Sequence, residues 1–235
     1  SQITFTSKIL NEKINIGISV PESYNKNLKL KPIYVLDGYY LAPVVAANLE
    51  ILSEENRSTP CIVIAVTSTN RQRDFTPKSD GATGQMAGSG GADNYLKYVE
   101  NELIPLIDIK FNTDTNRIII GHSLGGLLAY YSIINNPGLF HSIISIDGSL
   151  WWNESRTGKA VIEKLKNTPN FRGELFECRK DISQPVQLKP NLELLKYLAY
   201  NRPRGLLYYY LEIKNVTHAT VVYPGIYYGL KALII

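Results

Sequence analysis

Five consecutive residues, Gly121-His122-Ser123-Leu124-Gly125, fit the G-x-S-x-G pattern that holds the reactive serine of many hydrolases. The preceding segment, Arg117 to Ile120, is rich in β-branched residues and predicts a buried strand. The following segment, Gly126 to Ile134, predicts a helix. A serine at such a sharp turn has a strained backbone and needs small neighbours. The pattern therefore predicts a nucleophilic Ser123, with an ordinary glycine-rich turn as the alternative.

A serine hydroxyl is a poor nucleophile at neutral pH, so it needs a base within hydrogen-bonding reach and usually an acid that orients the base. In hydrolases with this turn, serine, acid and histidine follow one another in that order. His122 lies inside the motif and cannot turn its ring productively to the neighbouring hydroxyl. His141 follows Ser123 with no Asp or Glu between them. His218, just after a predicted strand, is therefore the expected base.

Three carboxylates are candidates for the orienting acid. Asp181 directly follows the predicted strand Glu174 to Lys180 and is the first choice. Glu177 lies within that strand, and Asp147 follows another predicted strand, Ser142 to Ile146. Each could instead be a surface carboxylate or part of a structural ion pair. A Ser-His pair without an acid is the remaining alternative, and its imidazole would be less well oriented.

Hydrolysis of an ester also needs N–H donors that face the tetrahedral oxyanion. The first is expected from the backbone of Leu124, the residue after the serine. The second is expected from the loop after the third predicted strand, Leu36 to Tyr40, where Gly38 lets the backbone turn and Tyr39 supplies the N–H. The alternative is a plain strand-to-helix turn in which Asp37 caps the next helix.

Strand and helix patterns alternate along the rest of the chain. Two N-terminal strands with alternating apolar residues predict an antiparallel hairpin, and solid apolar runs predict central parallel strands. The expected strands are 3–10, 14–20, 32–36, 61–67, 117–120, 142–146, 173–180 and 206–214, and the expected helices are 42–54, 93–109, 126–134, 157–166, 190–200 and 223–235. Residues 70–92 are polar, glycine-rich and without periodicity, which predicts a loop. Asp93 is expected to cap the helix that follows, and this helix should kink at Pro105. The pattern predicts an α/β fold with a mostly parallel eight-stranded sheet and helices on both faces.

Length and composition favour one α/β domain over residues 1–235, since 44% of residues are hydrophobic and 20% are charged. The net charge of +4 is mild, and no Lys/Arg block suggests nucleic acid. No apolar run is long enough for a membrane span, and no signal peptide is recognised. Because the chain starts at Ser1, a leader could have been removed, so the compartment stays open, as does the oligomeric state. Cys61 and Cys178 both lie in predicted strands, which favours two buried thiols over a disulfide.

Short segments along nearly the whole chain occur in the order typical of one known family. They are Val35–Gly38, Arg71–Pro77, Gly90–Asp93, Glu102–Pro105, Gly121–Gly126, Ser149–Trp152 and the segment around His218. In these segments the chain resembles the Putative esterase family of α/β-hydrolases, which includes esterase D-like and siderophore-cleaving esterases. The resemblance implies an α/β-hydrolase fold, Ser123 and His218 as catalytic residues, and no cofactor. It also implies small-molecule ester substrates with aromatic acyl groups, siderophore lactones or simple acyl chains.

Two segments depart from the family's pattern, and both concern the acid. Asp147 stands where the family often has a small or polar residue, and Phe176 to Asp181 is more charged than expected after its strand.

Two further pairs of residues are candidates for substrate binding. Arg71 and Arg73 could bind an anionic or catecholate substrate, or they could fold their loop through an ion pair with Asp74. Trp152, with its neighbour Trp151, could wall an aromatic pocket or form a hydrophobic plug.

These features together predict a serine carboxylesterase that works through an acyl-enzyme and needs neither metal nor cofactor. Two alternatives stay open. The first is an acyltransferase or a peptidase on the same fold, because such enzymes use the same side chains. The second is a non-catalytic binding module that keeps the fold.

Overall fold

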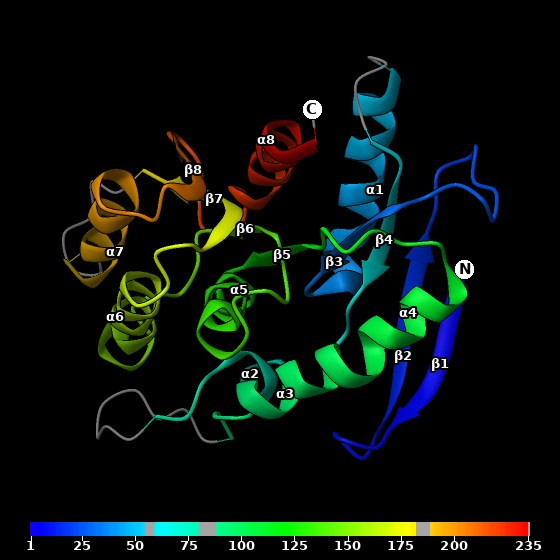
Figure 1. Cartoon of the computed structure of the whole chain (residues 1–235), viewed down its shortest axis with the longest axis horizontal. Helices are drawn as coiled ribbons and strands as arrows, with labels where there is room; N and C mark the ends of the chain where they lie inside the picture. The colour runs from blue at the N-terminus through cyan, green and yellow to red at the C-terminus, as the bar shows by residue number, and fades with distance from the viewer. Residues whose placement is uncertain (55–58, 80–87, 182–188, 235) are drawn as a thin grey trace.

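A computed structural model of the chain describes residues 1–54, 59–79, 88–181 and 189–234 (Figure 1). One eight-stranded sheet runs through it in the order β1-β2-β4-β3-β5-β6-β7-β8. The strands are β1 (Gln2–Ser7), β2 (Glu12–Ser19), β3 (Lys31–Val35), β4 (Cys61–Ala65), β5 (Ile118–His122), β6 (Ser142–Ile146), β7 (Arg172–Lys180) and β8 (Gly205–Ile213). The predicted α/β-hydrolase sheet is confirmed.

The N-terminal hairpin forms one edge of the sheet, and β1–β2 and β2–β4 are its antiparallel pairs. Ile14, Ile16 and Ile18 of β2 face the core, as their alternation with polar or small residues predicted. From β4 to β8 every neighbouring pair is parallel. In a parallel sheet all strands end on the same side, so the loops that follow β3, β5, β6 and β8 can meet there.

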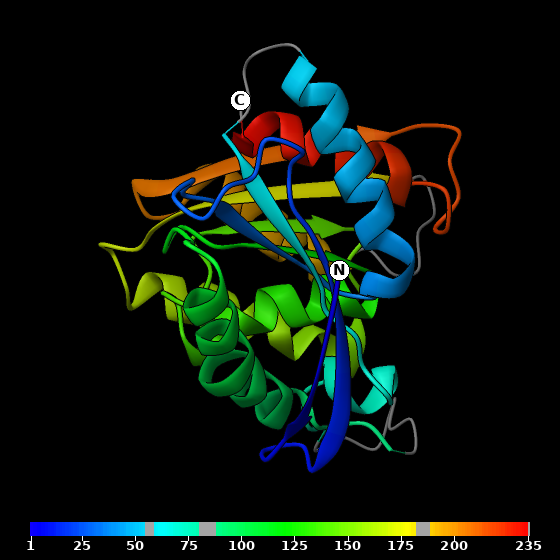
Figure 2. The same cartoon turned by 90° about the vertical axis from the view of Figure 1, so that its right-hand side faces the viewer.

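Helices cover both faces of the sheet, and each face has its own apolar core. The helices are α1 (Gly38–Glu54), α2 (Arg71–Phe75), α3 (Ala92–Tyr98), α4 (Ile104–Lys110), α5 (Leu124–Asn135), α6 (Trp152–Lys166), α7 (Lys189–Tyr200) and α8 (Val222–Ile234). Helices α1 and α8 lie on one face, and α3 to α6 lie on the other (Figure 2). The start of α1, helix α2 and the loop between β8 and α8 lie on one side of the molecule, at the right in Figure 2.

The region from residue 70 to 110 differs most from the prediction. Helix α2 forms within the segment predicted as a loop, and residues 80–87 of that segment lie outside the described residues. The helix expected at 93–109 is three pieces, because a π-helical turn, η1 (Val99–Leu103), separates α3 from α4. Pro105 then falls in the first turn of α4, directly after the π-helical turn. Asp93 does not cap α3, since Gly91 holds that position, and its carboxylate accepts a hydrogen bond from Tyr131 instead.

Cys61 and Cys178 are buried and unbridged, as predicted. Among the described residues, no helix combines the length and apolarity that a membrane crossing requires.

Candidate active site

Ser123 stands at a tight turn between β5 and α5, with a positive backbone φ of 59°. Such a conformation is unfavourable for a residue with a side chain, and the surrounding contacts must hold it. Its N–H donates to Ile146 O at 3.0 Å, and its carbonyl accepts from Ser149 N at 2.9 Å. A Cβ added at Gly121 would lie 2.2 Å from the backbone of Gly125, so the turn needs the glycine found there. The predicted strand–turn–helix geometry around the serine, called the serine elbow from here on, is therefore present.

Two backbone N–H groups at this side of the sheet have no acceptor within the described part of the chain. They belong to Leu124, the first residue of α5, and to Tyr39, the second residue of α1. The Gly38 N–H is already engaged by Val66 O at 3.0 Å. Asp37, not Gly38, takes the positive φ of this loop, while Gly38 is needed because a Cβ there would lie 2.4 Å from the Ala65 backbone. Free amides at the first turn of a helix attract negative charge.

His218, in the loop between β8 and α8, points its Nδ1 at Asp147 Oδ2, 2.6 Å away. The His218 side chain is 48% exposed, whereas that of Asp147 is 9% exposed. A neutral imidazole that donates from Nδ1 to a carboxylate keeps Nε2 free as an acceptor. The pair can therefore take a proton at Nε2, and the carboxylate stabilises the resulting cation.

The carboxylate that meets the ring is thus Asp147 and not Asp181, which the sequence favoured. Ile146 of β6 is level with Cys178 of β7, and β7 continues to Lys180. Asp181 therefore lies about two residues, roughly 7 Å, further along the strand direction, and one strand further from the elbow. Its backbone N–H donates to Ile213 O.

The third candidate acid, Glu177, is completely buried in an ion pair with Arg179 (Nε–Oε1 2.7 Å). Tyr130 donates a further hydrogen bond to its carboxylate at 3.0 Å. The Arg179 guanidinium also donates to Gly148 O at 3.1 Å, so this network braces the turn that follows Asp147. Burial raises the pKa of Glu177. Glu177 is therefore part of a structural ion pair, which was the alternative to a catalytic role for each of the three carboxylates.

The Ser123 hydroxyl hydrogen-bonds to Ser149 Oγ at 3.2 Å, and in the described part of the chain no hydrogen bond joins it to the His218 ring. The two segments are nevertheless adjacent, because the His122 and His218 rings lie 4.6 Å apart. His122 Nε2 lies 2.7 Å from the His218 carbonyl, which can only accept, so this nitrogen carries a proton. The pKa of His122 is lowered by burial and by the neighbouring His218. Ser149, which the sequence had suggested only as part of a family segment, is a residue of this site.

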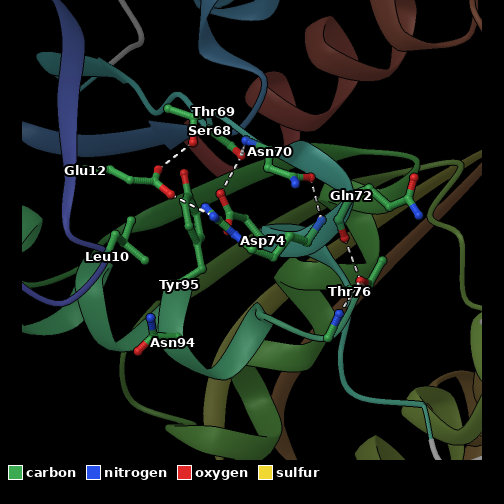
Figure 3. Close-up of polar contacts among 12 residues, drawn as sticks. Leu10, Glu12, Ser68, Thr69, Asn70, Gln72, Asp74, Thr76, Asn94 and Tyr95 are labelled. Atoms are coloured by element: carbon green, nitrogen blue, oxygen red, sulfur yellow. Dashed lines mark hydrogen bonds and ion pairs between the residues drawn. The ribbon is translucent and has the colours of Figure 1, made fainter. Parts of the chain in front are cut away.

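The two loop arginines have protein partners. Arg73 pairs with Asp74 (2.7 Å) and Glu12 (2.7 Å), which ties α2 to the N-terminal hairpin. Figure 3 labels the two acidic partners. Arg71 pairs with Asp37 at 2.6 Å and also donates to His122 O. Of the two roles expected for Arg73, substrate binding or an ion pair with Asp74 that folds the loop, the contacts agree with the ion pair.

The aromatic residues Tyr39, Tyr40, Trp151 and Trp152 differ in how far their side chains are exposed. Trp152 is fully buried, so it cannot wall an open pocket, whereas Trp151 is 39% exposed. Tyr39 and Tyr40 are largely exposed and meet edge to face with ring centroids 5.1 Å apart. A mostly apolar groove of about 580 Å³ runs beside Gly38 and Tyr39 along α1. The rings of Tyr39, Tyr40 and Trp151 therefore expose aromatic surface in the segments that follow β3 and β6.

Comparison with known proteins identifies the family and the fold of the chain. The sequence profile of the Putative esterase family matches residues 7–177. The chain is 26% identical to the ferri-bacillibactin esterase BesA of Bacillus subtilis (strain 168), over 92% of the chain and 83% of BesA. It is 31% identical to the uncharacterized protein YbbA of the same strain over 58% of the chain, a match that spans only 57% of YbbA.

A solved structure of an IroE-like serine hydrolase from Shewanella oneidensis is 26% identical, with a TM-score of 0.85, covering 100% of this chain and 79% of that one. The fold of the chain is therefore that of the α/β-hydrolase-like esterases. Because the family profile covers well over half of the residues and the elbow lies within the match, the chain belongs to the Putative esterase family.

Proposed function

We propose that this chain hydrolyses carboxylic esters through an acyl-enzyme, with Ser123 as nucleophile, His218 as base and Asp147 as the acid that orients the base. The observation that carries the proposal is the 2.6 Å bond between His218 Nδ1 and Asp147, with the imidazole 4.6 Å from the ring of His122, the residue before the strained serine. Membership of an esterase family supports the same reaction. The sequence-based choice of Asp181 is replaced by Asp147 because of this contact.

The reaction begins when the Ser123 side chain turns from Ser149 Oγ toward His218 Nε2. Catalytic hydrogen bonds are often long in the free enzyme and tighten when substrate binds. The hydroxyl oxygen attacks the ester carbonyl carbon while its proton passes to Nε2. The carbonyl oxygen becomes an oxyanion, which the free N–H groups of Leu124 and Tyr39 stabilise.

The tetrahedral intermediate then collapses. The bond from the carbonyl carbon to the alkoxy oxygen breaks, and the alcohol leaves with the proton held by His218. Water next attacks the acyl-enzyme and gives its proton to Nε2, so that the acid is released and Ser123 regains its hydroxyl hydrogen. The Asp147 carboxylate stabilises the imidazolium twice in each cycle.

Aromatic acyl esters are the substrate class we propose. The exposed rings of Tyr39, Tyr40 and Trp151 can stack on an aromatic acyl group. The relative BesA is named as a ferri-bacillibactin esterase. The apolar groove beside Tyr39 offers room for a further apolar part of the ester.

The Ser123→Ala variant tests the proposal. We expect the wild type to hydrolyse p-nitrophenyl acetate and the variant to lose this turnover, with a melting temperature close to that of the wild type. The lost contact to Ser149 is a single hydrogen bond between hydroxyls, which contributes about 1 kcal/mol. Turnover that persists in Ser123→Ala would reject the assignment. A wild type that hydrolyses no ester in a panel of acetyl, benzoyl and catecholate esters would reject the activity itself.

A further inference from the structure

Arg71 joins the two segments that hold the free amides. Its Nε donates to Asp37 Oδ1 at 2.6 Å, and its Nη2 donates to Asp37 Oδ2 at 2.9 Å. The same Nη2 donates to the carbonyl of His122 at 3.1 Å. Asp37 comes two residues before Tyr39, and His122 comes two residues before Leu124. One guanidinium therefore connects both halves of the proposed oxyanion hole.

The Asp37 loop needs such a support, because Asp37 has a positive φ of 53°. A non-glycine residue keeps this conformation only where its surroundings hold it. Its carbonyl accepts the N–H groups of Tyr40 and Leu41, so the residue's orientation also fixes the start of α1. A two-pronged bond from arginine to a carboxylate fixes direction as well as distance. The direction of the Tyr39 N–H thus depends on the Asp37–Arg71 pair.

Arg71 in turn projects from a rigid base. The Asn70 side chain caps α2 by accepting from Arg73 N at 3.0 Å, and Ser68 Oγ donates to the buried Asp74 carboxylate at 2.6 Å (Figure 3). The guanidinium also lies over the Phe75 ring, 5.4 Å from its centroid. Short, packed contacts of this kind restrict the rotamers of a long side chain.

We infer that Arg71 is a positioning residue, which sets the separation and direction of the Tyr39 and Leu124 N–H groups by bridging Asp37 and the His122 carbonyl. This inference rests on the proposed function. It assigns Arg71 to the oxyanion hole and not to recognition of a charged substrate, because the guanidinium is already paired within the protein. Displacing one oxyanion donor lowers kcat about 100- to 1000-fold in a well-studied protease, and partial misalignment costs less.

The test compares Arg71→Gln and Arg71→Lys on a neutral ester, p-nitrophenyl acetate, and an anionic one, mono-4-nitrophenyl succinate. We expect Arg71→Gln to lower kcat about 10- to 100-fold on both esters while KM changes less than about threefold. Arg71→Lys should recover only part of the loss, because an ammonium cannot hold both carboxylate oxygens and the carbonyl in one plane. The matched control is Arg117→Gln, which removes an ion pair to Asp108 (2.8 Å) at the other end of β5 and should leave kcat unchanged.

The Asp37→Asn variant completes the design. If both residues act through one bridge, the double variant Asp37→Asn/Arg71→Gln should be little slower than either single variant. Unchanged kcat in Arg71→Gln would overturn the inference, as would a rise in KM confined to the anionic ester, which would assign Arg71 to substrate binding. Should Arg71→Gln fail to fold, Arg71→Lys and Asp37→Asn give the same comparison. Failure of the proposed function gives a different result from failure of this inference, because it appears as an inactive wild type or as an active Ser123→Ala variant.

Discussion

Replacing Asp147 by asparagine tests the least expected part of the site. The substitution keeps the size and shape of the side chain but removes the charge that lies 2.6 Å from His218 Nδ1. An asparagine amide can also donate to Nδ1, which would place the imidazole proton on Nε2 and leave no base for Ser123. We therefore expect slower acylation with little change in the fold.

The size of the effect follows from the geometry. The imidazolium that forms during catalysis is about half exposed, so an effective dielectric constant of about 20 to 40 applies. Two unit charges about 4 Å apart then attract by about 2–4 kcal/mol. Since about 1.4 kcal/mol is tenfold in rate, the loss of the charge should lower kcat about 30- to 1000-fold. The wrong tautomer would lower it further.

The assay is steady-state hydrolysis of p-nitrophenyl acetate by Asp147→Asn and, as the matched control, Asp181→Asn. Asp181 is of the same residue type, follows the neighbouring strand and was the sequence's choice for the acid. Its variant should keep kcat within about threefold of the wild type. The reasoning is refuted if Asp181→Asn is the slower variant, or if Asp147→Asn keeps its activity, since a serine–histidine pair without an acid would then suffice.

Three further predictions concern the surroundings of the site. Gly121→Ala places a Cβ 2.2 Å from the Gly125 backbone, so we expect a loss of about 3 kcal/mol or more in the free energy of unfolding by urea, and an unchanged midpoint would contradict the close packing. Burial and the neighbouring His218 lower the pKa of His122, so the unfolded chain binds its proton more readily and stability falls as the pH drops below about 6.5. His122→Gln keeps a donor for the His218 carbonyl, and should show a smaller loss of stability between pH 7.5 and 5.5 than the wild type; an equal loss would show that His122 does not contribute. Trp151→Ala should raise KM for p-nitrophenyl benzoate about 2- to 12-fold relative to p-nitrophenyl acetate if the exposed ring stacks on the acyl group, and equal shifts for both esters would argue against this role.

The fold and the elbow could be predicted from sequence because their signals are local. The β-branched runs of β5 and β6 are buried on both faces, and that environment imposes its pattern on the residue types. The glycines around Ser123 are required by backbone contacts within a few residues, so the motif and its setting appear together. His218 could be chosen because chain order left few histidines to consider.

The acid could not be chosen in this way, because two neighbouring strands, β6 and β7, offer three carboxylates, Asp147, Glu177 and Asp181. The choice depends on how far β7 extends beyond β6 and on the left-handed backbone of Asp147, with a φ of 45°. Neither property has a signature in a single sequence. The bridge from Arg71 to Asp37 was missed for a related reason. It joins residues 34 positions apart, through a short helix in a segment without periodicity.

The central claim, that Ser123 is made nucleophilic by His218, is tested most directly by a fluorophosphonate reagent followed by peptide mass mapping. The account predicts one phosphonyl group per chain, attached to Ser123 in the wild type, with labelling strongly slowed in His218→Ala. Label on another residue, absence of label in folded wild-type protein, or equal labelling rates with and without the His218 imidazole would contradict it.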